Sequence, residues 1–149
     1  MAGFVITTQI GCPPAAAFDA SLDIDLHLRS MAASGERAVG GVTSGKIGPG
    51  ESVTWSARHF GVRWRMTSTI SAYERPVRFV DEQVRGPFRS WRHEHRFEER
   101  AGGTRMTDVV DFAAPLGPLG DVVAVTVLRA YLRGLIVRRN AALKAAVEA

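Results

Sequence analysis

Two histidines lie on the apolar face of one predicted strand, in the segment SWRHEHRFE over 90–98. Successive side chains of a strand point to opposite sides of the sheet, so Trp91, His93, His95 and Phe97 share one face. The charged residues of the segment take the other face, which we expect to meet water: Arg92, Glu94, Arg96 and Glu98. Imidazoles between two buried aromatic rings need polar partners. An interior cavity lined by this strand would explain them.

Three kinds of chemistry fit these histidines. Imidazole titrates near neutral pH, so His93 and His95 are candidate catalytic acid and base groups, with Asp108 as a third catalytic candidate. The same residues could instead form a hydrogen-bonded polar belt without catalysis. His-x-His on one face would also suit zinc, with His59 or Asp108 as third ligand. Because the spacing defines no third ligand, we assign neither a metal nor another cofactor.

Neighbouring strands are expected to contribute a largely apolar wall with a few polar groups, the usual composition of a small-molecule pocket. Two carboxylates, Asp81 and Asp108, fall on inward phases, so at least one should have a raised pKa or a cationic partner. Arg139 lies near the centre of the apolar face of a C-terminal helix and is the candidate partner. Alternatively, its stem covers apolar surface while its guanidinium reaches water. The expected ligand-binding residues are Trp55, His59, Trp64, Met66, Phe79, Asp81, Gln83, Trp91, Val110, Leu132, Ile136 and Arg139.

Regular turn signals predict an antiparallel meander. Turn signals that contain glycine or proline recur every 10 to 16 residues between β-rich runs, as at Gly61, Arg75-Pro76 and Gly86-Pro87. The predicted strands are 4–10, 37–44, 51–60, 62–72, 77–84, 88–99 and 104–112. Two short helices are expected between the first two strands, one starting at Pro13-Pro14 and one over 25–31. Apolar residues at helical spacing predict one long helix from Leu119 to Val147, about 40 Å long.

Length and composition favour one domain over 1–149 with an ordinary apolar share of 46%. The chain has no basic leader and no apolar run long enough to span a membrane, so we expect a cytoplasmic protein. Cys12 is the single cysteine and is expected to fill core space. The net charge of +4 comes from arginines scattered singly rather than in a basic block, which argues against a nucleic-acid partner.

Several motifs carry a family resemblance: FVDEQ at 79–83, GPFxxWxHxHxFE at 86–98, GTxMxD at 103–108 and PLG at 115–117. They resemble the SRPBCC group, the START and Bet v 1-like superfamily, in its bacterial polyketide cyclase/dehydrase-like branch, over essentially the whole chain. The resemblance implies an α+β helix-grip fold, in which a curved antiparallel sheet of about seven strands wraps a long C-terminal helix around a cavity.

Three function classes stay open, because a fold alone does not select an activity. The first is a binder or carrier of a small hydrophobic molecule, aromatic or polyketide- or lipid-like. The second is a cyclase or dehydratase that uses His93 or His95 to remove a proton, with Asp81, Asp108 or Gln83 holding the substrate. The third is an assembly role for the exposed long helix. A monomer and a homodimer are equally compatible with the sequence.

Overall fold

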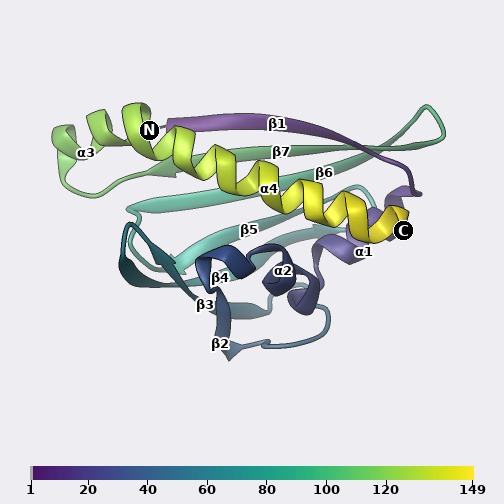
Figure 1. Cartoon of the computed structure of the whole chain (residues 1–149), viewed down its shortest axis with the longest axis horizontal. Coiled ribbons are helices and arrows are strands. Elements are labelled where there is room, and N and C mark those ends of the chain that lie inside the picture. The colour runs from purple at the N-terminus through teal and green to yellow at the C-terminus, as the bar shows by residue number, and fades with distance from the viewer. Residues whose placement is uncertain (1) are drawn as a thin grey trace.

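The computed structural model describes residues 2–149 and contains one antiparallel sheet of seven strands in the order β1-β7-β6-β5-β4-β3-β2 (Figure 1). All but the first strand of the chain lie next to their sequence neighbours, as the short turns predicted; β1 instead pairs with β7. The strands are β1 Ala2–Ile10, β2 Arg37–Gly41, β3 Ser52–His59, β4 Val62–Glu74, β5 Arg78–Arg85, β6 Ser90–Arg100 and β7 Gly103–Ala113.

Two short helices separate β1 from β2. Helix α1 (Pro14–Ser21) starts with proline in its first turn, where a missing N–H costs nothing. Helix α2 (Ile24–Ser30) is capped by Asp23, whose carboxylate accepts a hydrogen bond from the Leu26 N–H at 3.1 Å. A 3-10 turn, η1 (Ala32–Ser34), leads into β2.

The long C-terminal helix is helical from residue 117 to 148 but not uniformly so. It begins as α3 (Gly117–Val123), passes through a π-helical stretch η2 (Ala124–Leu128) and continues as α4 (Arg129–Glu148). Backbone angles at the junctions stay in the right-handed helical region, so the segments join without a break. No helix among residues 2–149 is both long enough and apolar enough to cross a membrane.

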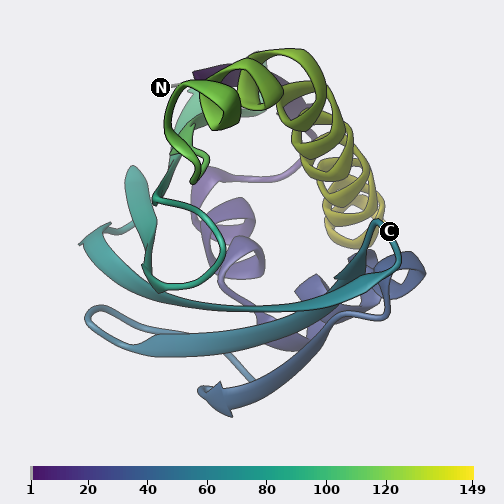
Figure 2. The same ribbon diagram turned by 90° about the vertical axis from the view of Figure 1, so that its left-hand side faces the viewer.

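The sheet curves around the interior, and the C-terminal helix closes the open side (Figure 2). Helix α4 packs on β1 and meets α1 and α2 near the C-terminus (Figure 1). This is the helix-grip arrangement that the sequence resemblance implied, and the α+β class is confirmed. The predicted strands agree with the observed ones within a few residues. The largest difference is at β2, which ends at Gly41 instead of residue 44.

Gly41 ends β2 for a steric reason. Its φ is +66°, which places it in the left-handed region, and a Cβ there would lie 2.1 Å from the carbonyl oxygen of Ser52. The pairing of β2 with β3 also shifts register between Ala38 and Gly40. The strand therefore bends away before the extended pattern of the sequence ends.

Two apolar clusters fill the interior, one at each end of the long helix. The first surrounds Phe18 and includes Phe79 and Phe97; the second includes Trp91 and Phe112. Strand β6 contributes to both clusters, with Trp91 in the second and Phe97 in the first. The histidines predicted on this face are therefore between the two clusters. We call the polar residues in this layer the polar belt: Thr8, Asp81, His93, His95, Asp108, Arg139 and Asn140.

One charged residue of β6 does not face water as expected. Glu94 is buried, with 6% of its surface exposed. Its carboxylate accepts hydrogen bonds from Arg78 Nη1 at 2.9 Å and Arg96 Nη2 at 2.9 Å. These guanidinium groups hold the pKa of Glu94 below its ordinary value although burial alone would raise it. The outer face of the sheet thus buries a carboxylate because arginines from the same face cover it.

Candidate functional site

The two histidines of β6 bind two carboxylates in a crossed pattern. In the sheet register His93 lies opposite Asp81, and His95 lies opposite Asp108. The hydrogen bonds instead run diagonally, from His93 Nε2 to Asp108 Oδ1 at 2.7 Å and from His95 Nε2 to Asp81 Oδ2 at 2.7 Å. The imidazole rings stack on each other, with centroids 3.7 Å apart and planes 20° apart. Stacking and diagonal bonds together fix both rings.

Asp108 is fully buried and is held from the helix side as well. Asn140 Nδ2 donates to Asp108 Oδ2 at 2.6 Å, and Arg139 Nη1 lies 3.5 Å from Asp108 Oδ1. Asn140 also donates to Thr8 Oγ1 at 3.2 Å and accepts from Arg139 at 3.0 Å. Arg139 as a whole is 6% exposed and its side chain 8%, so the interpretation in which its guanidinium reaches water is wrong. A buried carboxylate provides a stronger partner than solvent.

Asn140 was not predicted as part of this site. It lies four residues after Ile136, one turn along the same side of the helix, so helical spacing does contain a signal for it. From the sequence alone, a polar residue at the margin of an apolar helical face is expected to be exposed to solvent. Asn140 is nevertheless buried, at 2% exposure, because the helix brings it against Thr8 of β1 and Asp108 of β7.

The surroundings within the polar belt lower the pKa values of three of its members, Asp108, Asp81 and His95. Burial would raise the pKa of Asp108, but the hydrogen bond from His93 and the positive charges nearby hold it well below its ordinary value. The pKa of Asp81 is also lowered, with His95 as the main counterweight to burial. Burial and the neighbouring His93 lower the pKa of His95 to about 4. His95 is therefore neutral at pH 7, and both carboxylates are ionised.

These protonation states assign the tautomers. An ionised carboxylate only accepts hydrogen bonds, so Nε2 of each imidazole carries the proton that it donates. Nδ1 then has a free lone pair in a neutral ring. His95 Nδ1 is buried without a hydrogen-bond partner and lies 3.5 Å from Asp108 Oδ1. His93 Nδ1 makes no hydrogen bond either, and its nearest carboxylate oxygen is Asp81 Oδ2 at 3.9 Å. In the neutral ring, Nδ1 of His93 is thus an unused acceptor in a residue that lines the cavity.

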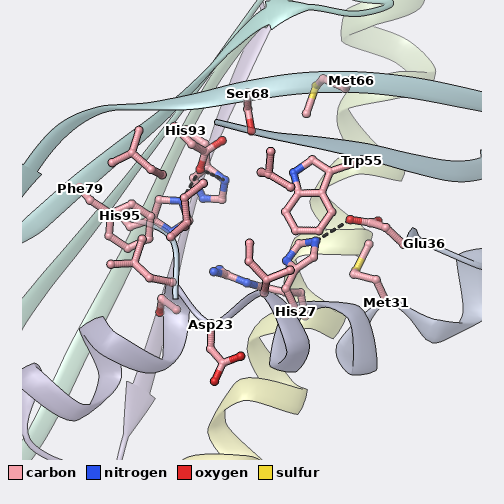
Figure 3. Close-up of a pocket in the computed structure, with 18 of the residues that line it drawn as sticks. Asp23, His27, Met31, Glu36, Trp55, Met66, Ser68, Phe79, His93 and His95 are labelled. Carbon is pink, nitrogen blue, oxygen red and sulfur yellow. Dashed lines mark hydrogen bonds and ion pairs between the residues drawn. The ribbon is translucent and has the colours of Figure 1, made fainter. Parts of the chain in front are cut away.

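A cavity of about 140 Å³ adjoins the polar belt. Figure 3 shows His93 and His95 on one side of it and Trp55 with α2 on the other. Most of the wall is apolar, with Phe79 and Ile70 from the sheet and Ile136 from the helix. The predicted site residues in the wall are Trp55, Met66, Phe79, Asp81, Trp91, His93, His95, Ile136 and Arg139. Asp108 lies behind the histidines and touches the cavity only through them.

Two predicted ligand-binding residues lie beyond the cavity, and the structure corrects their placement. Trp64 has the inward phase of Met66 and Ser68 but is 41% exposed, and its indole N–H donates to the His59 carbonyl at 3.0 Å. Strand β4 pairs with β5 only from Thr67 onward, so its first residues project past the curved sheet. His59 points toward the helix there, with Nδ1 2.7 Å from the Tyr131 hydroxyl, outside the wall.

Three more predicted residues have packing or loop roles instead. Gln83 binds the turn before β6, donating to the Phe88 carbonyl at 2.8 Å and accepting from the Phe88 N–H at 3.2 Å. Val110 is completely buried in the cluster around Trp91, and Leu132 packs against the same cluster. None of the three lines the cavity, although Val110 and Leu132 face the interior cluster around Trp91.

Sequence reasoning also missed one wall of the cavity, which α2 and the chain before β2 provide. His27 and Glu36 both line it, and His27 Nε2 lies 2.5 Å from Glu36 Oε1. The His27 ring packs on Trp55, with centroids 4.3 Å apart (Figure 3). No periodic pattern marks these residues, since one lies on a seven-residue helix and the other in a loop.

Asp81, His93 and His95 each bring one potential metal-ligand atom, and these three atoms lie within 4.8 Å of one another. The third residue is thus Asp81, not His59 or Asp108 as considered from the sequence. Zinc binds imidazole nitrogen in the ring plane at about 2.1 Å. With the rings stacked at 3.7 Å, an ion shared by both would lie roughly 1.8 Å out of each plane, most of a Zn–N bond length. The observed geometry suits hydrogen bonding, and a metal would require both rings to turn.

The comparison with protein families agrees with this architecture. The chain belongs to the family described as polyketide cyclase/dehydrase and lipid transport, which it matches over residues 1–148. No curated protein matches the sequence significantly.

Solved structures show the same fold at low identity. The Zhui aromatase/cyclase from a Streptomyces species aligns with a TM-score of 0.73 and 15% identity, covering 99% of this chain and 93% of that one. Protein Ms6760 from Mycobacterium smegmatis has a TM-score of 0.73 and 18% identity over 98% and 90%. A major latex-like protein from Panax ginseng has a TM-score of 0.65 and 15% identity over 97% and 95%. At such identities the likeness concerns the fold alone.

Proposed function

We propose that this protein binds a small aromatic molecule in the cavity between the sheet and the C-terminal helix. The observation that carries the proposal is an apolar-walled cavity with a polar belt at one side, where Nδ1 of His93 makes no hydrogen bond. Such a wall supplies affinity by burying apolar surface, and the few polar groups orient the ligand. A cytoplasmic location and a small molecule, rather than nucleic acid, as the partner are part of the same proposal.

The size of the cavity limits the ligand. At about 140 Å³ it is close to the engineered cavity of about 150 Å³ that binds benzene in another protein. A single aromatic ring therefore fits, whereas a longer polyketide chain or lipid needs the cavity to open. Burying about 150 Å² of apolar surface at about 25 cal/mol per Å² yields at most ~4 kcal/mol before the cost of immobilising the ligand, so apolar contact alone gives no better than about millimolar affinity. Tighter binding must come from hydrogen bonds to the wall.

A second candidate function is cyclisation or dehydration, favoured by the geometry of His93 and Asp108. Asp108 fixes the Nε2–H tautomer of His93, and Arg139 and Asn140 in turn fix Asp108. An imidazole oriented by a buried carboxylate is the arrangement of a general base. The free Nδ1 atom would remove an acidic proton from carbon beside a carbonyl, and Asp108 would stabilise the imidazolium that forms.

Binding is tested first with an environment-sensitive hydrophobic dye. We expect the dye to bind the native protein stoichiometrically and to be displaced by planar aromatic compounds. Absence of dye binding and of calorimetric binding by toluene and phenol would remove both candidate functions. The His59→Gln variant serves as a control, since His59 lies outside the cavity and should leave displacement unchanged.

The two candidate functions are separated with His93→Gln. For an enzyme, the variant should retain binding while turnover of a polyketide substrate falls by about 10² to 10⁴, the usual contribution of a positioned acid or base. For a carrier, only affinity should change, by about 0.5 to 1.5 kcal/mol. The measurement pairs calorimetry with product analysis. Unchanged binding together with unchanged chemistry in both His93→Gln and His95→Gln would show that these residues do not form the site.

A further inference from the structure

The wall opposite the polar belt contains a second imidazole–carboxylate pair. His27 Nε2 lies 2.5 Å from Glu36 Oε1, and the two side chains are 26% and 8% exposed. Both residues line the same cavity as His93 and His95 (Figure 3). The cavity therefore has imidazoles on two separate walls, with Trp55 and other side chains between them.

The two pairs present the same atom to a ligand. Glu36 accepts from His27 Nε2, as Asp108 accepts from His93 Nε2, so in a neutral ring the lone pair remains on Nδ1. His27 Nδ1 makes no hydrogen bond with any residue that the structure describes, 2–149. Packing on Trp55 holds the ring in its plane. A purely structural tie between α2 and the chain before β2 would not require the imidazole to face the cavity.

We infer that the His27–Glu36 pair is a second polar recognition site, and that the ligand is a single aromatic ring with a hydroxyl group at each of two positions. The inference rests on the proposed binding function and names its ligand class. One hydroxyl donates to Nδ1 of His27, and the other donates to Nδ1 of His93 across the cavity. Trp55 and Ile136 contact the ring between them.

Physical limits favour this class over larger or purely apolar molecules. The cavity volume of about 140 Å³ leaves room for one ring and few further atoms. An apolar ring would displace any water from the free imidazole acceptors and leave them unpaired, which lowers affinity. A molecule with one hydroxyl satisfies one wall only. Each satisfied acceptor should improve affinity about 3- to 10-fold.

The test measures, by calorimetry, the binding of resorcinol, hydroquinone, phenol and toluene to the full chain. We expect at least one of the two benzenediols to bind about 3- to 10-fold more tightly than phenol. In His27→Phe, which keeps an aromatic ring on Trp55 but has no lone pair, this preference should fall to about one. His27→Leu provides a second variant if the first does not fold. The matched control His59→Leu, outside the cavity, should keep the wild-type preference.

The outcomes separate this inference from the proposed function. If wild type binds toluene or phenol but neither benzenediol more tightly, or if both His27 variants keep the preference, the second recognition site is wrong while the binding function stands. If none of the four compounds binds wild-type protein, the proposed function itself fails, and the ligand class falls with it.

Discussion

Arg139 Nη1 lies 3.5 Å from Asp108 Oδ1, so the C-terminal helix brings a buried positive charge to a fully buried carboxylate of β7. Asn140, the next residue on the helix, binds the other oxygen of the same carboxylate at 2.6 Å. The helix is therefore tied to the sheet by polar contacts in the layer between the two apolar clusters. A change in the position of the helix would break both contacts at once.

Replacing Arg139 by methionine should destabilise the protein. Methionine keeps much of the apolar stem but leaves Asp108 without its guanidinium, and breaking a buried ion pair typically costs about 3 kcal/mol. Urea denaturation measures the loss. Arg138→Met, on the exposed side of the same helix, is the matched control and should change stability little. Equal effects of the two substitutions would show that Arg139 contributes only apolar contact.

The protein should become less stable as pH decreases, because His95 is buried in its neutral form. Its folded pKa of about 4 lies below the ordinary value of 6.5, so between those values the unfolded chain binds a proton that the folded protein does not. Stability is therefore lost as pH falls from about 6.5 to about 4, by ~3 kcal/mol. Denaturation at several pH values should show this slope, and His95→Gln should flatten it.

His59→Gln is the control for this slope, because burial also lowers the pKa of His59, although His59 is only partly buried. It should remove a smaller part of the slope. Below about pH 4 the carboxylates Asp81 and Asp108, whose pKa values are lowered, become protonated, and stability falls further in both the wild type and the His59→Gln variant. A His95→Gln variant with the wild-type slope between pH 6.5 and 4 would contradict a neutral buried His95.

Purified protein should contain no stoichiometric zinc or iron. The stacked rings of His93 and His95 direct their nitrogen lone pairs along nearly parallel planes, which does not suit one shared ion. Elemental analysis should find well under one metal per chain, and chelators should leave the melting temperature unchanged. About one metal per chain, lost in His93→Ala, would overturn this expectation.

Filling the cavity should weaken ligand binding without unfolding the protein. Ser68 is buried in the cavity wall, so Ser68→Leu extends a branched side chain into a space of about 140 Å³. We expect dye and phenol binding to weaken at least about 10-fold, the effect of losing ~1.4 kcal/mol of contact. Ser71→Leu, exposed on the same strand, makes the same chemical change outside the cavity and should bind normally. Equal binding by both variants would place the ligand elsewhere.

The sequence alone determined the elements and the faces of their side chains. Alternation with a period of two is a local property of extended chains, so Trp91, His93, His95 and Phe97 could be assigned to one buried face. Turn residues likewise determined the meander, and helical spacing determined the long terminal helix. The family resemblance added the arrangement of these elements around a cavity.

Tertiary structure decided which of these groups meet. The register of β5, β6 and β7 and the side-chain rotamers made the histidine bonds diagonal, from His93 to Asp108 and from His95 to Asp81. The depth of the helix buried Arg139, and the end of β5 left Trp64 exposed despite its inward phase. Periodicity reports the direction of a side chain from its own strand or helix, whereas a contact depends on where a second element lies.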